Sequence, residues 1–120
     1  MTVVSALQPL KHYIWGDQCD GWNLVDQPEL SVKQERMPPH TAEAEHYHRK
    51  ARQFFFILQG TAIFETADGR IEVGANQGLE IPPELKHRIK NESETDLVFI
   101  LCSQPATTGD RIENVDGGSD

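Results

Sequence analysis

The sequence predicts an all-β fold, a sandwich, barrel or jelly roll, from three observations. Pro and Gly interrupt the chain every several residues, which leaves little room for a long helix. Short segments rich in β-branched and aromatic residues lie between these interruptions. About nine such segments follow one another with turn residues between them, as in sandwiches and barrels. A chain of 120 residues can form one such domain with a real core, and has little room for a second.

The expected strands follow the chain in a regular order. Residues 22–25 and 30–37 are the first two, and the second ends at Pro38 because proline cannot donate to a strand ladder. Seven more expected strands occupy residues 45–50, 53–60, 61–67, 70–74, 78–82, 87–91 and 96–103. Asp68-Gly69 predicts a two-residue hairpin turn between two of these strands.

Three parts are expected along the chain. Residues 1–29 form an N-terminal segment that covers the barrel or is exchanged in a dimer, and residues 30–104 form the barrel itself. Residues 105–120 form a polar, acidic and Gly-rich tail. Such a composition cannot bury enough apolar surface to order a chain, so we expect the tail to be partly mobile.

The charge of the chain argues against several classes of partner. The formal net charge is −8 at pH 7, and no cluster of Lys and Arg offsets it, so nucleic acid is not expected as a partner. No apolar run approaches the roughly 20 residues of a membrane-spanning helix, and residues 1–10 lack the pattern of a secretory signal. We therefore expect a cytoplasmic protein without a membrane partner. Cys19 and Cys102 are far apart in the sequence and are expected to be buried free thiols.

Three histidines have the clearest chemical meaning. His46 and His48 are two residues apart on an expected strand, so their side chains point to the same face. If the next strand folds back on this one, Gln53 faces them across the hairpin. His87 begins a later strand in which Ile89 shares its inward face. Three neutral imidazoles would suit a divalent transition metal (Fe, Zn, Ni, Mn or Cu) better than Mg or Ca, which prefer oxygen ligands.

These residues lie in two segments that resemble the motifs of the cupin family. Residues 46–60 are similar to the first motif, in which His-x-His is followed by Glu and then Gly, with Gln53 at the Glu position and Gly60 at the Gly position. Residues 82–91 are similar to the second motif, and the positions that match are Pro82, His87 and Asn91. The resemblance implies a double-stranded β-helix (jelly-roll) barrel with a metal inside, and the implied ligands are His46, His48, Gln53 and His87.

The chain departs from the family pattern in two ways. His40, Asn76 and Glu84 stand where the motifs have Gly; Asn tolerates positive φ, whereas Glu84 suggests an altered turn. Gln53 replaces a carboxylate with a neutral amide, which should lower the affinity for a metal. Two roles are open for Gln53: its oxygen coordinates the metal, or it forms a hydrogen bond to a metal-bound water.

Other interpretations of the acidic residues and histidines stay open. Glu45 faces away from its neighbour His46 on the strand and is a poor substitute ligand, whereas Glu43 lies in less regular chain and is not excluded. The three histidines could instead be ordinary hydrogen-bonded residues of a barrel that has lost its metal. His40 is expected at the mouth of the barrel, where contact with a ligand and a surface position are both open.

The resemblance implies a metal-dependent oxidoreductase, dioxygenase-like, that acts on a small apolar or aromatic molecule. The expected substrate pocket consists of Phe55, Ile57, Ile89, Phe99 and His40. The sequence identifies no catalytic residue beyond the metal ligands. Two alternatives are a binding protein that holds a small molecule without turnover and an enzyme of the sugar isomerase type.

One apolar stripe predicts a homodimer. If Gln53 faces the metal, alternation places Phe54, Phe56 and Leu58 on the outer face of the barrel. Large apolar side chains in a row are costly to leave in water, so either the N-terminal segment or a second subunit should cover them. Family resemblance favours the second subunit, because small cupins commonly pair through their sheet faces.

Overall fold

The computed structural model describes residues 1–113 and confirms the all-β class, since this range contains strands and no helix. No part of these residues forms a helix that could span a membrane. The strands are β1 (Lys11–Trp15), β2 (Cys19–Gln27), β3 (Leu30–Met37), β4 (Thr41–Ala42), β5 (His46–His48), β6 (Arg52–Gln59), β7 (Thr61–Thr66), β8 (Gly69–Gly74), β9 (Gly78–Ile81), β10 (His87–Asn91), β11 (Leu97–Gln104) and β12 (Arg111–Glu113).

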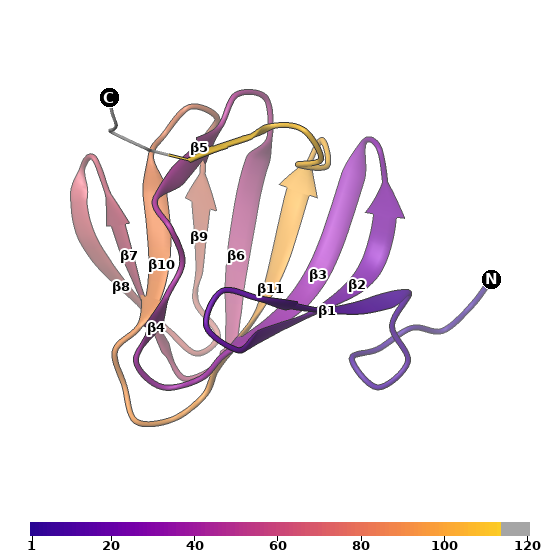
Figure 1. Cartoon of the computed structure of the whole chain (residues 1–120), viewed down its shortest axis with the longest axis horizontal. Coiled ribbons are helices and arrows are strands. Elements are labelled where there is room, and N and C mark those ends of the chain that lie inside the picture. Colours follow the sequence, from indigo (N-terminus) through magenta and orange to yellow (C-terminus); the bar gives the residue numbers. More distant parts are fainter. Residues whose placement is uncertain (114–120) are drawn as a thin grey trace.

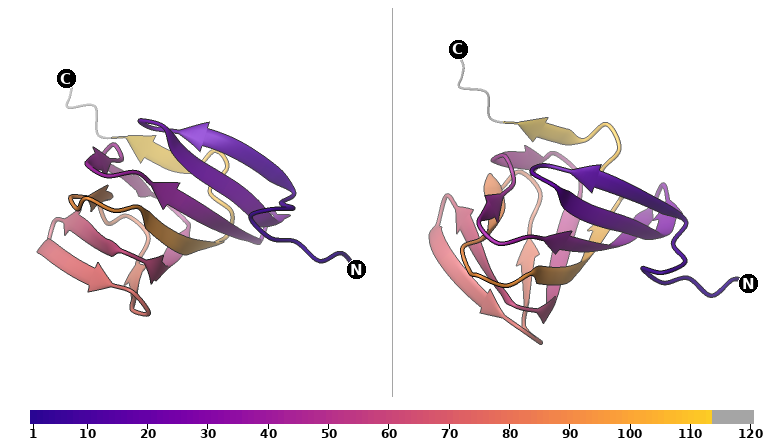
Figure 2. Two further views of the ribbon diagram at one scale, coloured as in Figure 1. Left: turned by 90° about the horizontal axis from the view of Figure 1, so that it is seen from below. Right: turned by 60° about the horizontal axis from the view of Figure 1, so that its bottom comes forward.

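Two antiparallel sheets form the two layers of a jelly roll (Figures 1 and 2). The first sheet, with the order β1-β2-β3-β11-β6-β9, is called sheet A, and the second, with the order β12-β5-β10-β7-β8 and β4 paired to β10, is called sheet B. A single buried cluster joins them: Ile57 and Phe99 come from sheet A, and Phe64 and Ile89 come from sheet B. The core therefore lies between the sheets, as alternation along each strand requires.

All nine expected strands are present, and the β7–β8 hairpin is confirmed. Its two turn residues are Ala67 and Asp68, one position earlier than expected, because Thr66 pairs with Gly69. Gly69 has a φ of 119° and begins β8 instead of closing the turn. Gly69 adopts this positive φ without steric cost because glycine has no Cβ atom.

Strands β1, β4 and β12 were not expected from the sequence. β1 and β2 form a hairpin that extends sheet A beside β3, so the N-terminal segment adds strands at the sheet edge. β12 pairs with β5, which orders the first part of the polar tail next to the histidines. The mobility expected for the end of the tail concerns residues 114–120, which lie outside the described residues.

Alternation along β6 is as the sequence predicts. Gln53, Phe55 and Ile57 are buried, whereas Phe54 and Leu58 are each 43% exposed. Within residues 1–113, no segment covers these two side chains, and the first residues of the chain extend away from the barrel (Figures 1 and 2). The outer stripe is therefore open in a single chain.

The three residues that replace motif glycines all adopt positive φ. The φ angles are 60° at His40, 65° at Asn76 and 72° at Glu84, and Gly60 of the first motif has a φ of 87°. L-residues reach this left-handed region at a cost, which is why glycine is favoured there. The backbone at Glu84 therefore has the conformation that glycine adopts in the motif, so the φ angle of this turn is not altered as the sequence suggested.

Candidate metal centre

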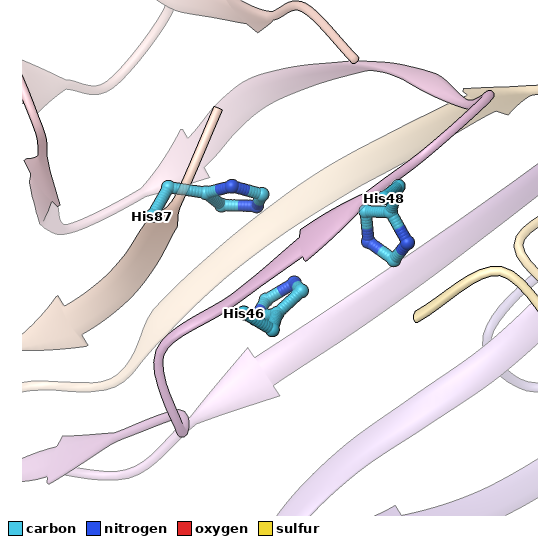
Figure 3. A group of neighbouring side chains, drawn as sticks. All are labelled: His46, His48 and His87. Carbon is cyan, nitrogen blue, oxygen red and sulfur yellow. The ribbon is translucent and has the colours of Figure 1, made fainter. Parts of the chain in front are cut away.

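Adjacent strands of sheet B bring the three histidines together. His46 and His48 project from β5, and His87 projects from the neighbouring β10, where it pairs directly with His46 (Figure 3). Their side chains are 2%, 4% and 0% exposed respectively. One nitrogen from each ring can be chosen so that all three lie within 4.8 Å of one another, which is compatible with binding to a single ion.

Backbone carbonyls orient two of the rings. Nδ1 of His46 donates to the carbonyl oxygen of Ala44 at 2.9 Å, and Nδ1 of His87 donates to that of Leu85 at 2.8 Å. Because Nδ1 carries the proton, Nε2 of each ring is the lone-pair nitrogen that a metal could use. Nε2 of His87 and both ring nitrogens of His48 are buried without a hydrogen-bond partner in the protein.

The three imidazoles are held in the neutral form. Burial, reinforced by the neighbouring histidines, lowers the pKa of His46 to about 3. Burial and then His87 lower the pKa of His48 to about 4, and burial also lowers the pKa of His87. Neutral imidazole is the form that coordinates metals, so no proton has to leave at neutral pH before an ion binds.

Gln53 lies at the same cavity with its oxygen unpaired. Its side chain is 4% exposed, and Nε2 donates to Oγ of Ser103 at 3.1 Å. Oε1 is buried without a partner in the protein. A buried amide oxygen without a partner is costly, and a cation or a bound water would satisfy it.

The side chains present therefore fit a divalent metal. The histidine nitrogens lie together, Gln53 lines the same cavity with an unpaired buried oxygen, and these donor types suit a transition metal of the kind expected. Glu43 is outside this group, since its Oε1 lies 4.0 Å from Nδ1 of His46, on the ring edge that faces Ala44. Glu45 is also outside the group.

A cavity of about 410 Å³ opens beside the histidines. His46, His48 and Gln53 line it, and His87 lies next to them with its ring centroid 4.4 Å from that of His46. About half of the remaining wall is polar or charged, and the side chains that make it so are Tyr13, Lys33, Glu35, Glu43, Thr107, Arg111 and Glu113. Trp15, Phe55 and Leu101 supply apolar patches of the wall.

The residues expected to form an apolar pocket are placed differently. Phe55 lines the cavity, but Ile57, Ile89 and Phe99 are at most 1% exposed, belong to the core cluster and are absent from the cavity wall. Alternation correctly predicts that these side chains point into the barrel. It does not predict how far along the barrel axis each one lies, and one part of the interior is packed with core side chains while another part is an open cavity. His40 is also absent from the wall; it is exposed, and its Nε2 lies 2.7 Å from Oε2 of Glu94.

Sequence reasoning missed most of the charged wall. A clue was available in β3, where alternation from the buried Met37 places Lys33 and Glu35 on the inward face. Charged residues on the inward face of a strand are unusual and indicate a polar cavity. Tyr13 and Arg111 could not be found in this way, because β1 and β12 were not expected as strands.

A family model described as the cupin domain matches residues 33–103. Among curated relatives, an uncharacterized protein of Methanocaldococcus jannaschii is 24% identical over 83 residues, which are 69% of this chain and 66% of that protein. The polyketide synthase CurC of Streptomyces cyaneus is 25% identical over 80 residues, 67% of this chain and 52% of that protein. The chain thus spans between about half and two thirds of the curated relatives that it matches.

Solved structures of the same fold resemble the chain at low sequence identity. The polyketide cyclase RemF of Streptomyces resistomycificus has a TM-score of 0.77 at 16% identity, with coverage of 88% of this chain and 80% of RemF. A predicted oxalate decarboxylase of Thermotoga maritima has a TM-score of 0.77 at 16% identity, covering 88% and 100%. A sugar phosphate isomerase of Silicibacter pomeroyi has a TM-score of 0.74 at 14% identity, covering 88% and 76%. At these identities the likeness shows the fold alone.

Proposed function

Because the chain belongs to the cupin family, we propose that it is a metal-dependent enzyme that moves protons on a small polar, hydroxylated molecule, in the manner of an isomerase. One observation supports this proposal most strongly. The cavity beside the histidines is walled by Lys33, Glu35, Glu43 and Arg111, all of which can exchange hydrogen bonds or charge with a polar ligand. A flat apolar molecule would take these groups out of water without offering them polar contacts beyond those that they already make, such as the hydrogen bond of Glu35 with Tyr13 and the ion pair of Glu43 with Arg111, which is costly.

The proposed metal ligands are His46, His48, His87 and the oxygen of Gln53. A divalent ion held by these groups would act as a Lewis acid on a substrate oxygen. The protein wall would then orient the hydroxyl groups of the substrate through its own donors and acceptors, and bury the reacting atoms away from bulk water. Enclosure of the substrate in this way strengthens every polar contact that it makes.

The fold relatives are compatible with proton-moving chemistry, although they do not fix the reaction. Their names describe an isomerase, a decarboxylase and a cyclase, which are different reactions on one architecture. The choice among reactions therefore depends on the cavity wall of this chain. Its ionisable side chains favour proton transfer over the capture of an apolar substrate.

A dioxygenase-like oxidoreductase is the second candidate, and the apolar part of the wall favours it. Trp15, Phe55 and Leu101 offer a surface for an aromatic ring. Such an enzyme would need oxygen for turnover, whereas an isomerase would not. A binding protein without turnover is a third outcome that the same experiment separates.

The test uses the metal-loaded protein and two readouts. Proton exchange from deuterated water into small hydroxycarbonyl compounds is followed by NMR, and oxygen uptake is followed with small aromatic diols. Exchange without oxygen uptake is expected, and oxygen uptake alone would favour the second candidate. Metal binding with neither activity would contradict an enzymatic role, and exchange that persists unchanged in a His48→Ala variant would contradict a role for the metal in it.

We also propose two properties that the sequence suggests for the whole protein. The first is a homodimer formed through the outer face of sheet A, for which the exposed Phe54 and Leu58 are the support. The second is a cytoplasmic location, for which the free thiols of Cys19 and Cys102 are the support.

A further inference from the structure

A tyrosine and a buried glutamate form a pair on the wall of the cavity that comes from sheet A. Tyr13 of β1 pairs with Gly21 of β2, and Gly21 pairs with Glu35 of β3, so the three residues lie in one row across the sheet. The hydroxyl of Tyr13 donates to Oε2 of Glu35. Both side chains line the cavity that His46 and His48 reach from sheet B.

Gly21 makes this contact possible. The ring of Tyr13 lies across the backbone of Gly21, and a Cβ atom at that position would be 2.0 Å from Cζ of Tyr13. Any side chain at residue 21 would therefore push the phenol away from Glu35. The absence of a side chain at Gly21 thus allows the hydrogen bond between Tyr13 on β1 and Glu35 on β3 to pass across β2.

Within the described residues, no cation forms a direct ion pair with Glu35. Glu35 is 8% exposed, and among residues 1–113 no Lys or Arg nitrogen forms a salt bridge with it. Lys33 lies over the ring of Tyr13, with Nζ 5.5 Å from the ring centroid. Burial raises the pKa of the Glu35 carboxyl, and the hydrogen bond from Tyr13 and the charges of Lys33 and Arg111 lower it only in part. A buried carboxylate that accepts one hydrogen bond from a neutral donor and has no direct ion pair costs stability.

We propose that Tyr13 and Glu35 form a proton relay in which Tyr13 contacts the substrate and Glu35 holds the exchanged proton. This inference rests on the proposed isomerase-like function and names the group that moves the proton. The expected substrate class is a small hydroxycarbonyl compound, whose C–H bond next to the carbonyl is acidic enough to break.

The relay balances without an external reactant. The Tyr13 oxygen takes the proton from the substrate carbon while the original Tyr13 proton passes to Glu35, so one C–H bond breaks and one O–H bond forms on the Glu35 carboxyl. The electron pair of the broken C–H bond stays on the substrate and delocalises onto the carbonyl oxygen. The reverse relay returns a proton to the same carbon. When the proton goes instead to the former carbonyl carbon, the hydroxyl proton of the substrate moves to the former carbonyl oxygen, and the carbonyl group forms at the neighbouring carbon. Because the burial of Glu35 favours its neutral form, accepting the proton relieves part of the cost of the buried charge.

Two variants separate this role from a merely structural one. Tyr13→Phe keeps the ring over Gly21 and removes only the hydroxyl, whereas Glu35→Gln keeps an acceptor for Tyr13 but cannot take up a proton. We expect each variant to lower the rate of solvent proton exchange by about 100-fold or more, the lower range for acid–base groups. Glu35→Asp should recover part of the rate. Tyr47→Phe is the matched control, since Tyr47 lies between the two histidines on β5 and points away from them.

The measurements combine exchange rate, metal affinity and thermal stability. In Glu35→Gln, the zinc affinity measured by calorimetry should be close to that of wild type, and the melting temperature should be no lower than that of wild type. A lower exchange rate would then not be explained by loss of the metal site or of the fold. If wild-type protein catalyses no exchange, the relay and the proposed function fail together. If wild type catalyses exchange and both variants match it, the relay alone is overturned and Tyr13 is only a clamp for the N-terminal hairpin.

Discussion

At the scale of single residues, we expect Gln53 to determine how tightly the site holds a metal. Its Oε1 is buried and unpaired while its Nε2 is fixed by Ser103, so the oxygen is the free end of the amide. We expect Gln53→Glu to tighten zinc binding by about 10-fold or more, because a carboxylate offsets part of the charge of the ion in a medium of low dielectric constant. Calorimetric titration of the metal-free protein measures this directly.

The same variant should weaken the metal-free protein. A carboxylate buried beside Ser103 without a cation should lower the free energy of unfolding by about 1–3 kcal/mol. Gln27→Glu, at an exposed position, controls for added charge and should change neither quantity. An unchanged zinc affinity in Gln53→Glu would show that residue 53 does not contact the metal.

Glu35 gives the stability of the protein a defined dependence on pH. Its ordinary pKa of 4.5 is raised in the folded state by burial, with partial opposition from the hydrogen bond of Tyr13 and from the charges of Lys33 and Arg111. A carboxyl whose pKa is higher in the folded state is bound to its proton more tightly there, so stability falls as pH rises from about 4.5 through the folded pKa. Glu35→Gln should therefore raise the free energy of unfolding at pH 7, and the gain should shrink toward pH 4.

Urea denaturation of both proteins at pH 4 and pH 7 checks this prediction. Glu29→Gln, at an exposed position, should show no comparable difference between the two pH values. If Glu35→Gln is equally destabilised at both pH values, the hydrogen bond that the carboxylate accepts from Tyr13 stabilises the fold by more than the burial of its charge destabilises it.

The sequence predicts the histidine site well because its geometry is local. His46 and His48 share a face by strand alternation alone, and the pairing of His87 with His46 follows once the strands are antiparallel neighbours. The residues of the cavity wall cannot be predicted from local strand geometry in this way. Whether an inward residue such as Ile89 or Lys33 meets core or open space depends on its level in the closed barrel, which alternation does not encode.

At the scale of turns and strands, Glu84 occupies a position whose backbone conformation favours glycine. Its φ of 72° lies in the left-handed region, and its N–H donates to the carbonyl oxygen of His48 at 2.6 Å, which ties the β9–β10 turn to β5. Replacement by Gly keeps this hydrogen bond and removes the clash of Cβ. We expect Glu84→Gly to raise the free energy of unfolding by up to about 1 kcal/mol, measured by urea denaturation.

Two controls isolate the backbone as the cause. Glu84→Ala keeps Cβ and should give no comparable gain, although it removes the same charge. Asn76→Gly, at a φ of 65°, should gain less than Glu84→Gly because Asn tolerates the left-handed region. Equal gains in the Gly and Ala variants at residue 84 would assign the effect to charge instead.

Asp110 fixes the last strand that borders the site. Its carboxylate accepts hydrogen bonds from the N–H groups of Arg49, Lys50 and Ala51, at distances between 2.9 and 3.2 Å, in the turn that joins β5 to β6. Arg111 follows it and reaches into the cavity wall. Asp110→Ala should loosen β12 and lower the free energy of unfolding by about 1–3 kcal/mol, because these donors lose a charged acceptor.

Hydrogen exchange locates the effect of this variant. Faster exchange should be confined to the β5–β6 turn and to β12, while β7 and β8 should keep their protection. Asp26→Ala, at an exposed position, serves as the control. Uniformly faster exchange across both sheets would contradict a local clamp.

Strand prediction succeeded where alternation or a turn marked the segment, and failed where pairing is imposed by the rest of the fold. The nine predicted strands carry apolar residues with clear boundaries. β12 is a three-residue strand in a polar tail, and only its pairing with β5 makes it a strand. The same applies to β4, with two residues beside β10.

At the scale of the whole molecule, the open outer face of sheet A is the feature that a single chain does not explain. Phe54 and Leu58 of β6 are each 43% exposed, and the β1–β2 hairpin lies at the edge of the sheet instead of over them. The neighbouring strand β11 adds Val98, Ile100 and Cys102, which are partly buried, between its buried inward residues. The outer face is therefore apolar across two adjacent strands.

A second copy of the chain is the occupant that we predict for this face. Burying a large apolar side chain is worth roughly 1.5–3 kcal/mol, and at less than half exposure each of Phe54 and Leu58 would still contribute roughly 1 kcal/mol on each of two chains. Light scattering after size exclusion should report a dimer at micromolar concentration. Phe56→Glu, in the middle of the stripe, should give monomers or aggregates while zinc binding at the histidines is kept.

Ile71→Glu is the matched control, since Ile71 is 37% exposed on β8 of sheet B and its replacement should leave the dimer intact. A stable wild-type monomer would contradict the prediction, and would mean that the stripe stays in contact with water in the native protein.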